Sequence, residues 1–502
     1  MDNKVITPDR RDLFLAIGMV LCGFLFWEGG MLSSESALGK AVFISLACIT
    51  AAAYMRATGV KQSRASLITL SAIVVLIIPF VIYAGRTEHI ITMFALGPLY
   101  LYWIARSFSQ SIDSKLSVYA AGDVIKQGFM TPFMNYESCP EVLINNSRGK
   151  GGKGALMVGI GVLLAIPLMI VALILLSQAD KSFGTLIDNI IDQLSWKWLR
   201  YIGELILGIP VAFYIFGMVY GNAKGRTDES FNKKAMSKAA RAMAKLPPLI
   251  GATILICLNM IYIIFLGLQI RHVIMGLPKE MTYSEFARQG FFQLCELSML
   301  DLALIVVVSV FKKRSDKATK LTKLQIALMS LLTIGISCTA LAKMFMYINV
   351  FGLTQKRVWT STFIIFLIIV FGAIALHQFV RINIGKAVCV TGIIILILFN
   401  FAGVDKTIAK YNIARYREGT LKMMDMKLMV KLDDSALPEI YEVWKKDGDK
   451  AVNMAELLRM NRGQYSWADW SIERARANEV RDDFYRNYYC VEDSQNGNKE
   501  KE

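Results

Sequence analysis

Histidine is scarce in this chain, which contains only three among 502 residues. His89, His272 and His377 lie far apart, so no pair has the spacing of a zinc site or a catalytic dyad. The motifs H-E-x-x-H and G-x-S-x-G are missing, and no two acids stand four residues apart within an apolar run. We therefore expect no metal, no cofactor and no catalytic residues, and a protein that is more readily a non-enzyme than an enzyme.

The eight cysteines also lack the spacing of a metal site or a disulfide framework. No two stand in a C-x-x-C pattern, and most lie inside apolar runs, where cysteine behaves as a small hydrophobe. The sequence therefore predicts neither a disulfide framework nor a metal centre. A cleaved signal peptide is not expected, because residues 1–11 are polar and basic and the apolar run after them is too long for a signal h-region.

Long apolar runs are what the sequence has in abundance. Apolar residues make up 55% of the chain, and runs long enough to cross a bilayer as helices recur along it. We predict an all-α, polytopic transmembrane helical bundle with eleven spans. The spans are predicted at residues 13–31, 37–55, 66–84, 90–106, 155–177, 199–220, 248–270, 290–311, 324–349, 360–379 and 384–402.

The formal net charge of +16 would suit a nucleic-acid-binding protein, but its distribution indicates a membrane protein instead. The N-terminal tail and every second loop, counted with their flanking residues, hold 27 Lys or Arg, whereas the alternate loops hold 10. Basic loops stay on the cytoplasmic side of a membrane. We therefore predict a multi-pass protein of the inner, or cytoplasmic, membrane with its N-terminus in the cytoplasm and no nucleic-acid partner.

Two of the loops placed in the cytoplasm are long, residues 107–154 and 221–247. The glycine–lysine run at 149–154 has the composition of a phosphate-binding loop, but it lacks the Walker spacing and follows no strand. A flexible basic entry to the next span is the better interpretation. In the second loop the basic residues predict a helix at the membrane surface that contacts anionic lipid head groups.

The last hundred residues differ in character from the rest. They hold 18 Lys or Arg and 19 Asp or Glu, and their apolar residues follow amphipathic spacing, which is typical of a folded helical module. With an odd number of spans, this module lies outside the cytoplasm. We predict a transmembrane bundle at 1–402, an extracytoplasmic helical tail at 403–490 and a disordered end at 491–502.

Amphipathic stretches divide the predicted tail into successive helices. Apolar positions favour a first helix around Ile408–Tyr416, and Trp467, Trp470 and Tyr485 are expected on one face of the last helix. We expect this module to offer a surface for a protein partner in the envelope.

Ionisable residues inside the spans are candidate functional residues, because each needs a partner or water there. Glu296 and Lys343 lie about 9 Å below the outer boundary of consecutive antiparallel spans, at 1.5 Å per residue, so we expect an ion pair between them. Such a pair could line a pathway or a ligand pocket, or could only lock two helices together. The sequence favours neither.

Asp301 lies deeper, near mid-membrane, and has no basic neighbour at its depth. It could relay protons, or it could be a neutral, hydrogen-bonded structural residue. We expect a polar cavity open to the outer side around these charges. Its other expected members are Gln293, Arg288, Tyr347 and Glu204, although Glu204 could also be an interfacial residue.

A tight turn on the outer side completes the candidate site. Gly352 suits a left-handed C-cap and Thr354 suits the N-cap of the next helix. Thr282 and Glu285 form a capping-box pattern at the same predicted surface. Lys356 and Arg357 in the turn could bind a phosphate or acids of the tail, or could anchor the chain at the interface.

These residues also occur in motifs that resemble a known family. The motifs are Tyr283–Leu294, Tyr347, Gly352–Thr354 with Arg357, Asn400, Ile408–Tyr416, Met424-Asp425 and Asp434–Pro438. Together, over roughly residues 240–445, they resemble bacterial multi-pass membrane proteins known as domains of unknown function of the DUF4153 and DUF4173 type. Ser284 departs from the alanine expected after the tyrosine. The resemblance implies a protein of the bacterial envelope and supplies no activity.

We expect an envelope membrane protein that binds a ligand, a lipid or a partner for sensing or scaffolding. The alternative is a secondary transporter or flippase that uses Glu296, Lys343 and Asp301, and a third possibility is an intramembrane enzyme acting on a lipid-linked substrate. A continuous polar path towards Asp301 would favour transport, whereas a closed bundle covered by the tail would favour binding.

Overall fold

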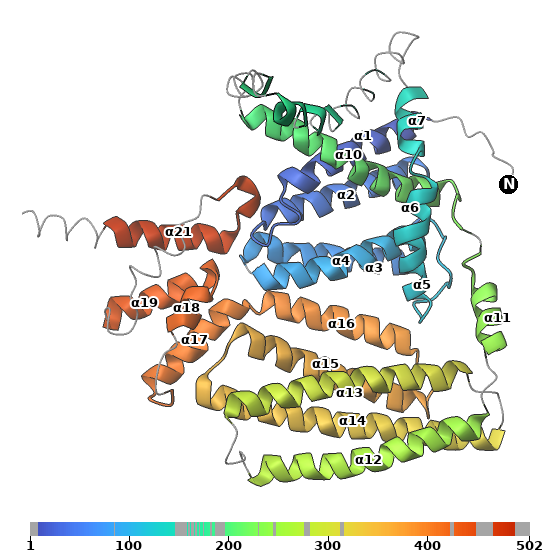
Figure 1. Ribbon diagram of the computed structural model, residues 1–502, viewed down its shortest axis with the longest axis vertical. Coiled ribbons are helices and arrows are strands. Elements are labelled where there is room, and N and C mark those ends of the chain that lie inside the picture. The colour runs from blue at the N-terminus through green and yellow to red at the C-terminus, as the bar shows by residue number, and fades with distance from the viewer. Residues whose placement is uncertain are drawn as a thin grey trace, which may run out of the picture. The chain divides into compact units, whose positions relative to one another are not determined.

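The computed structural model is built of helices (Figure 1). It describes residues 9–84, 86–145, 196–228, 230–243, 247–275, 282–311, 316–421, 426–447 and 465–486, with scattered positions between 158 and 185. No strand occurs in these described ranges. The chain forms two compact units, which are considered separately.

Unit 1 contains the first helices of the chain, α10 and one short segment of the tail, residues 465–471. Its long helices are α1 (Arg10–Glu28), α2 (Leu38–Ala57), α3 (Arg64–Ile82), α4 (Arg86–Ser107) and α10 (Trp196–Ala223). Its short helical pieces are α5 (Ala120–Ile125), a π-helical turn (Lys126–Met130), α6 (Thr131–Met134) and α7 (Ser138–Asn145).

Two glycines allow α1 and α10 to cross with their backbones in contact. A Cβ atom on Gly23 would lie 2.1 Å from the carbonyl oxygen of Gly208, so neither position has room for a side chain. Close approach at small residues is a common basis of helix association in membranes. The two helices run antiparallel, because Asp12 at the start of α1 pairs with Lys224 just after α10, at 3.1 Å.

Unit 2 contains most of the remaining helices. They are α11 (Lys233–Met243), α12 (Pro248–Met275), α13 (Tyr283–Phe311), α14 (Asp316–Phe351), α15 (Gln355–His377), α16 (Ile384–Phe401), α17 (Val404–Arg417), α18 (Met426–Lys431), α19 (Leu437–Asp447) and α21 (Ile472–Phe484). The longest helix, α14, packs against α12, α13 and α15. Its buried Ser330 and Ser337 donate to carbonyls one turn earlier, so their hydroxyls are satisfied inside the bundle.

The predicted all-α polytopic architecture is confirmed. In the described part of the chain, nine helices are long and apolar enough to cross a membrane: α2, α3, α4, α10 and α12 to α16. The predicted span at 13–31 is the helix α1, but any 18 residues of α1 include three charged side chains, so it is not one of the nine. The predicted span at 155–177 lies mostly outside the described residues.

The tail contains helices as expected, but Trp467 and Trp470 are not in the last one. The predicted first helix is α17, whereas Trp467 forms a single 3₁₀ turn and Trp470 is extended, before α21 begins at Ile472. Ser466 and Asp469 form a capping box that closes this turn locally. The expected aromatic face of Trp467, Trp470 and Tyr485 is therefore wrong, and residues 465–471 pack within unit 1 instead.

Acidic residues are concentrated inside the tail. The backbone N–H of Asp433 donates to Asp405 at 2.8 Å, and Asp405 also accepts from Gln355 at 2.6 Å. Burial, reinforced by the charge of Asp405, raises the pKa of Asp433 to about 7. Burial, reinforced by Asp433, raises the pKa of Glu473 to about 7 as well. The folded tail thus holds these two carboxyl groups protonated at a pH where free carboxyl groups are ionised.

The stability of the tail should consequently fall as the pH rises. Between pH about 4 and about 7 the folded tail keeps protons that the unfolded tail has released, so its free energy of unfolding decreases through this window, by on the order of 2–4 kcal/mol. Hydrogen-exchange protection of α19, corrected for the intrinsic rate, should be higher at pH 5.5 than at pH 8. Asp433→Asn should weaken this pH dependence of protection. If protection in that variant still falls with pH as steeply as in the natural protein, Asp433 is not its source.

Candidate functional site

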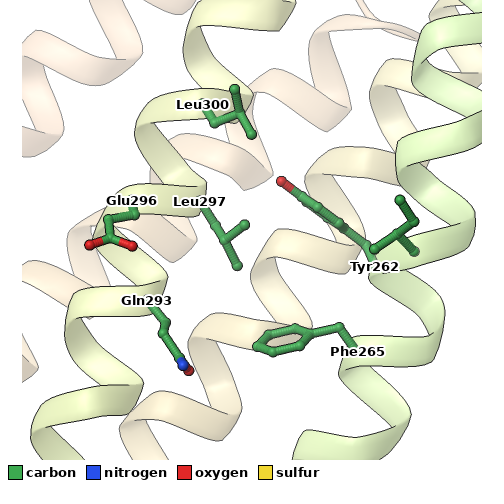
Figure 2. A pocket seen from close by; sticks show the side chains of 7 residues that line it. Tyr262, Phe265, Gln293, Glu296, Leu297 and Leu300 are labelled. Atoms are coloured by element: carbon green, nitrogen blue, oxygen red, sulfur yellow. The ribbon is translucent and has the colours of Figure 1, made fainter.

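A groove with a volume of about 420 Å³ lies between α12 and α13 in unit 2 (Figure 2). It is lined by Ile261, Tyr262, Phe265, Gln293, Glu296, Leu297 and Leu300. On each helix these residues recur every three or four positions, so one face of each helix borders the groove. In Figure 2, Gln293 and Leu297 reach from α13 towards Phe265 and Tyr262 on α12, whereas Glu296 lies to the side of this line.

Five of the seven lining residues are apolar or aromatic, and the other two are an amide and a carboxylate. Glu296 is exposed and forms no ion pair with any described side chain within 4.0 Å. Such a groove can hold an apolar chain between its walls and a hydrogen-bond donor or a positive group beside Glu296.

A second, much smaller cavity of about 10 Å³ adjoins the groove and shares Phe265 and Gln293 with it. Lys343 lies there and is only 4% exposed. Its ammonium donates to the side-chain oxygen of Gln269 and lies 4.3 Å from the centre of the Phe286 ring. The cation is therefore held by an amide and an aromatic face.

The expected ion pair between Glu296 and Lys343 is not formed between these two described side chains. The reason is helix register: α13 begins at Tyr283, well before the predicted boundary at residue 290. Lys343 is level with Gly290, where a Cβ atom would lie 3.1 Å from the Lys343 side chain. Glu296 is six residues further along α13, which is about 9 Å at 1.5 Å per residue.

Asp301 is fully buried behind the wall of the groove. It accepts hydrogen bonds from the hydroxyls of Tyr262, at 2.7 Å, and Thr333, at 2.6 Å. The three residues join α12, α13 and α14, which agrees with the expected hydrogen-bonded structural role. The Tyr262 ring lines the groove, so a single hydroxyl separates Asp301 from it.

The residues around the turn at Gly352–Thr354, predicted to be external, form a separate cluster in unit 2. Tyr347 donates to Ser284 at 3.0 Å, and the Arg357 guanidinium lies 3.8 Å from the Tyr347 ring centre. Thr354 accepts from the backbone of Arg357 at 3.3 Å, which confirms the predicted cap, and Gly352 has the predicted positive φ of 77°.

Arg357 does not face outwards to an anion. It donates to the carbonyls of Phe351 and Gly352, and Arg415 of the tail donates to those of Ile348 and Asn349. Two cations thus satisfy the C-terminal carbonyls of α14. Lys356 and Arg288 are exposed, and neither lines the groove.

Glu204 belongs to unit 1 and not to the groove. Arg200 bridges it to Glu28, with contacts of 2.6 Å to Glu204 and 2.9 Å to Glu28. Trp467 of the tail donates to the other oxygen of Glu28 at 3.0 Å. Both acids thus belong to a salt-bridged cluster beside the tail segment.

The tail segment also satisfies the start of α2. The backbone N–H groups of Ala37 and Leu38 donate to the carbonyls of Ala468 and Trp470, at 2.9 and 3.2 Å. The first turn of a helix needs such acceptors, and no side chain caps α2.

Several site residues were not identified from the sequence. Tyr262, Phe265 and Gln269 of α12 read as ordinary members of an apolar span, and only Gln269, a polar residue within that span, offered a signal. The contact between the tail and the start of α2 could not be predicted from residue types, because backbone carbonyls form it.

Apolar helices of membrane-spanning length, with a few buried polar groups between them, define this chain as a polytopic α-helical membrane protein. Residues 14–443 match the family model of DUF4153, a domain of unknown function, so the chain belongs to that family. This confirms the resemblance of the sequence motifs and extends it nearly to the N-terminus. Comparisons with the curated proteins and with the solved structures give no match.

Proposed function

We propose that this protein binds a membrane amphiphile in the α12–α13 groove and serves the bacterial envelope in sensing or scaffolding rather than catalysis. The observation that supports this most is the groove itself, an apolar cavity between two candidate membrane spans with one carboxylate on its border. Within a bilayer such a groove opens to acyl chains, so its natural occupant has an apolar chain.

Glu296 would determine which head group binds. It stands 13 residues after the start of α13, about 20 Å along the helix axis, where an ionised side chain requires a partner. With Lys343 held elsewhere, a donor group on the ligand can supply that partner. Gln293, one turn away on the same wall, offers a further polar contact.

Filling the groove tests the proposal. Leu297→Trp should reduce the lipid that co-purifies with the protein by about tenfold or more, because the indole occupies the space of the chain. Native mass spectrometry of protein extracted in mild detergent measures the bound lipid. Met299→Trp is the matched control, since Met299 lies on α13, is exposed and does not line the groove. Equal lipid retention in both variants would refute the proposal.

We further propose that the N-terminus is cytoplasmic and the tail extracytoplasmic, in the cell membrane. Contacts at the two ends of α2 support this. Tyr54 near the end of α2 donates to Asp12 of the N-terminal helix at 2.6 Å, whereas Leu38 at its start contacts the tail at Trp470. These positions are 16 residues apart, about 24 Å along the helix.

Reporter fusions test this orientation. Alkaline phosphatase fused after residue 486 should be active and green fluorescent protein at the same position dark, and the opposite result is expected for fusions at the N-terminus. A cytoplasmic tail would contradict the proposed orientation without bearing on the groove.

The partners follow from this arrangement. The basic helix α11 would lie on anionic lipid head groups at the cytoplasmic surface, and the tail would meet a protein partner outside. Transport or flipping is the second candidate, favoured by the position of Asp301 one hydroxyl behind the groove wall. If transport is correct, Asp301→Asn should abolish substrate movement across vesicles while lipid retention persists.

A further inference from the structure

We propose that residues 121–134, in the connection between α4 and α7, lie at the boundary of the bilayer across the ends of α4 and α10 and present an apolar stripe to lipid acyl chains. The sequence places this stretch in a cytoplasmic loop, and it is too short to span a membrane. Its side chains, its depth beside α4 and α10, and its internal hydrogen bonds each support insertion.

The polarity of this segment is inverted relative to a helix in water. Its exposed residues are all apolar: Ala121, Ile125, Phe129, Phe133 and Met134. Four of them recur every fourth position, which makes one stripe, and Phe129 and Phe133 are 70% and 62% exposed. A stripe of large apolar side chains facing outwards suits a hydrocarbon environment.

Polar side chains of the same segment point into unit 1 instead. Asp123, Lys126, Gln127 and Thr131 are all buried. The side-chain oxygen of Gln127 accepts from Asn222 of α10 at 2.6 Å. Charged and amide groups turned inwards while phenylalanines face outwards are typical of protein surrounded by lipid.

Contacts with α4 and α10 give the depth of the segment. Tyr214 of α10 donates to the carbonyl of Gly128 at 2.7 Å, and a Cβ atom on Gly128 would lie 3.3 Å from Leu101 of α4. Tyr214 is nine residues before the end of α10 at Ala223, and Leu101 is six before the end of α4 at Ser107. Gly128 therefore contacts side chains whose backbones lie about 9–14 Å inside the ends of two candidate spans, while Gln127 beside it bonds Asn222, one residue before the end of α10.

After Gly128 the chain stays against the last turns of α10. A Cβ atom on Gly221 would lie 2.9 Å from the methyl group of Thr131, and one on Gly217 would lie 2.7 Å from the carbonyl oxygen of Pro132. Asn135 then donates to the carbonyl of Arg226 at 2.9 Å. The last turns of α10, from Tyr214 to Ala223, rise about 14 Å, and Arg226 lies just beyond them. The segment thus runs across the ends of the spans, as Figure 1 shows for α5, α6 and α7.

Backbone hydrogen bonding is also compatible with insertion. α5, the π-helical turn and α6 follow one another without a gap, so most backbone groups are bonded within the segment. Non-helical backbone is tolerated at membrane depth where it is buried in protein, as Gly128 is here. Lipid is the occupant that fits, since the stripe is continuous in depth with two spans and carries no charge.

Photo-crosslinking at the stripe tests the inference. The full chain with Phe129→benzoylphenylalanine would be reconstituted in vesicles of phosphatidylethanolamine and phosphatidylglycerol, irradiated and analysed by mass spectrometry. We expect lipid adducts in yields similar to those at Ile68, an exposed residue of the span α3. Lys61, exposed between α2 and α3, should give few adducts.

Two other outcomes would overturn the inference. A crosslinked dimer at position 129 would mean that a second copy covers the stripe, and adduct yields as low as at Lys61 would mean that the stripe faces water. Phe129→Asp and Phe133→Asp provide a second measurement in the same vesicles. Both should lower the melting temperature, whereas no loss in either variant would also count against insertion.

Discussion

Gly208→Leu is expected to prevent α1 and α10 from packing, with a loss of at least about 3 kcal/mol in the stability of unit 1. A Cβ atom at this position would already lie 2.5 Å from the backbone of Gly23. A side chain could relieve such a clash by changing rotamer, but a helix backbone cannot. A unit of this size should melt about 10 °C lower. Thermal unfolding of the purified protein in detergent measures the effect.

Gly203→Leu is the matched control for this prediction. Gly203 lies on the same helix α10, and a Cβ atom there would meet no atom within 4 Å. Its melting temperature should stay close to that of the natural protein. Equal melting temperatures for the two variants would show that the glycine crossing does not hold the helices together.

Asp434→Asn is expected to destabilise the tail by about 3–5 kcal/mol. The carboxylate of Asp434 pairs with Arg474 at 2.8 Å and also with Arg481, and all three side chains are buried. Loss of the carboxylate charge leaves two buried guanidinium groups without the anion that they share, and their desolvation is no longer compensated.

Hydrogen exchange of the full-length protein measures this effect in the peptides that cover α19 and α21. Asp434→Asn should abolish most of their protection, while α12 to α14 keep theirs. The control is Asp482→Asn on α21, because Asp482 is exposed. Unchanged exchange in Asp434→Asn would mean that the apolar core of the tail suffices without the ion pairs.

Some local features of the candidate site could be predicted from the sequence because each depends on neighbouring residues. Thr282 and Glu285 form the capping box that their spacing predicts, with contacts of 3.0 and 3.3 Å. Gly352 and Thr354 end one helix and begin the next as predicted, since a positive φ and a side-chain acceptor are properties of single residues.

Pairing between helices could not be predicted in the same way. The ion pair between Glu296 and Lys343 was inferred from depths counted from predicted helix boundaries, and α13 starts one to two turns earlier than expected. An error of seven residues at a boundary moves a side chain about 10 Å along the axis, which exceeds the reach of an ion pair. The α12 wall of the groove could not be predicted either, because apolar residues around a span do not reveal which face meets a neighbour.

The sequence by itself determined the class of this protein, because length and apolarity alone decide whether a helix can cross a bilayer. The family motifs and the local helix caps were also readable from it. Only the tertiary structure decided that Lys343 contacts Gln269, that residues 465–471 satisfy the start of α2, and that residues 121–134 turn their polar side chains inwards. Each of these depends on contacts between segments far apart in the chain, and residue spacing within one segment contains no information about them.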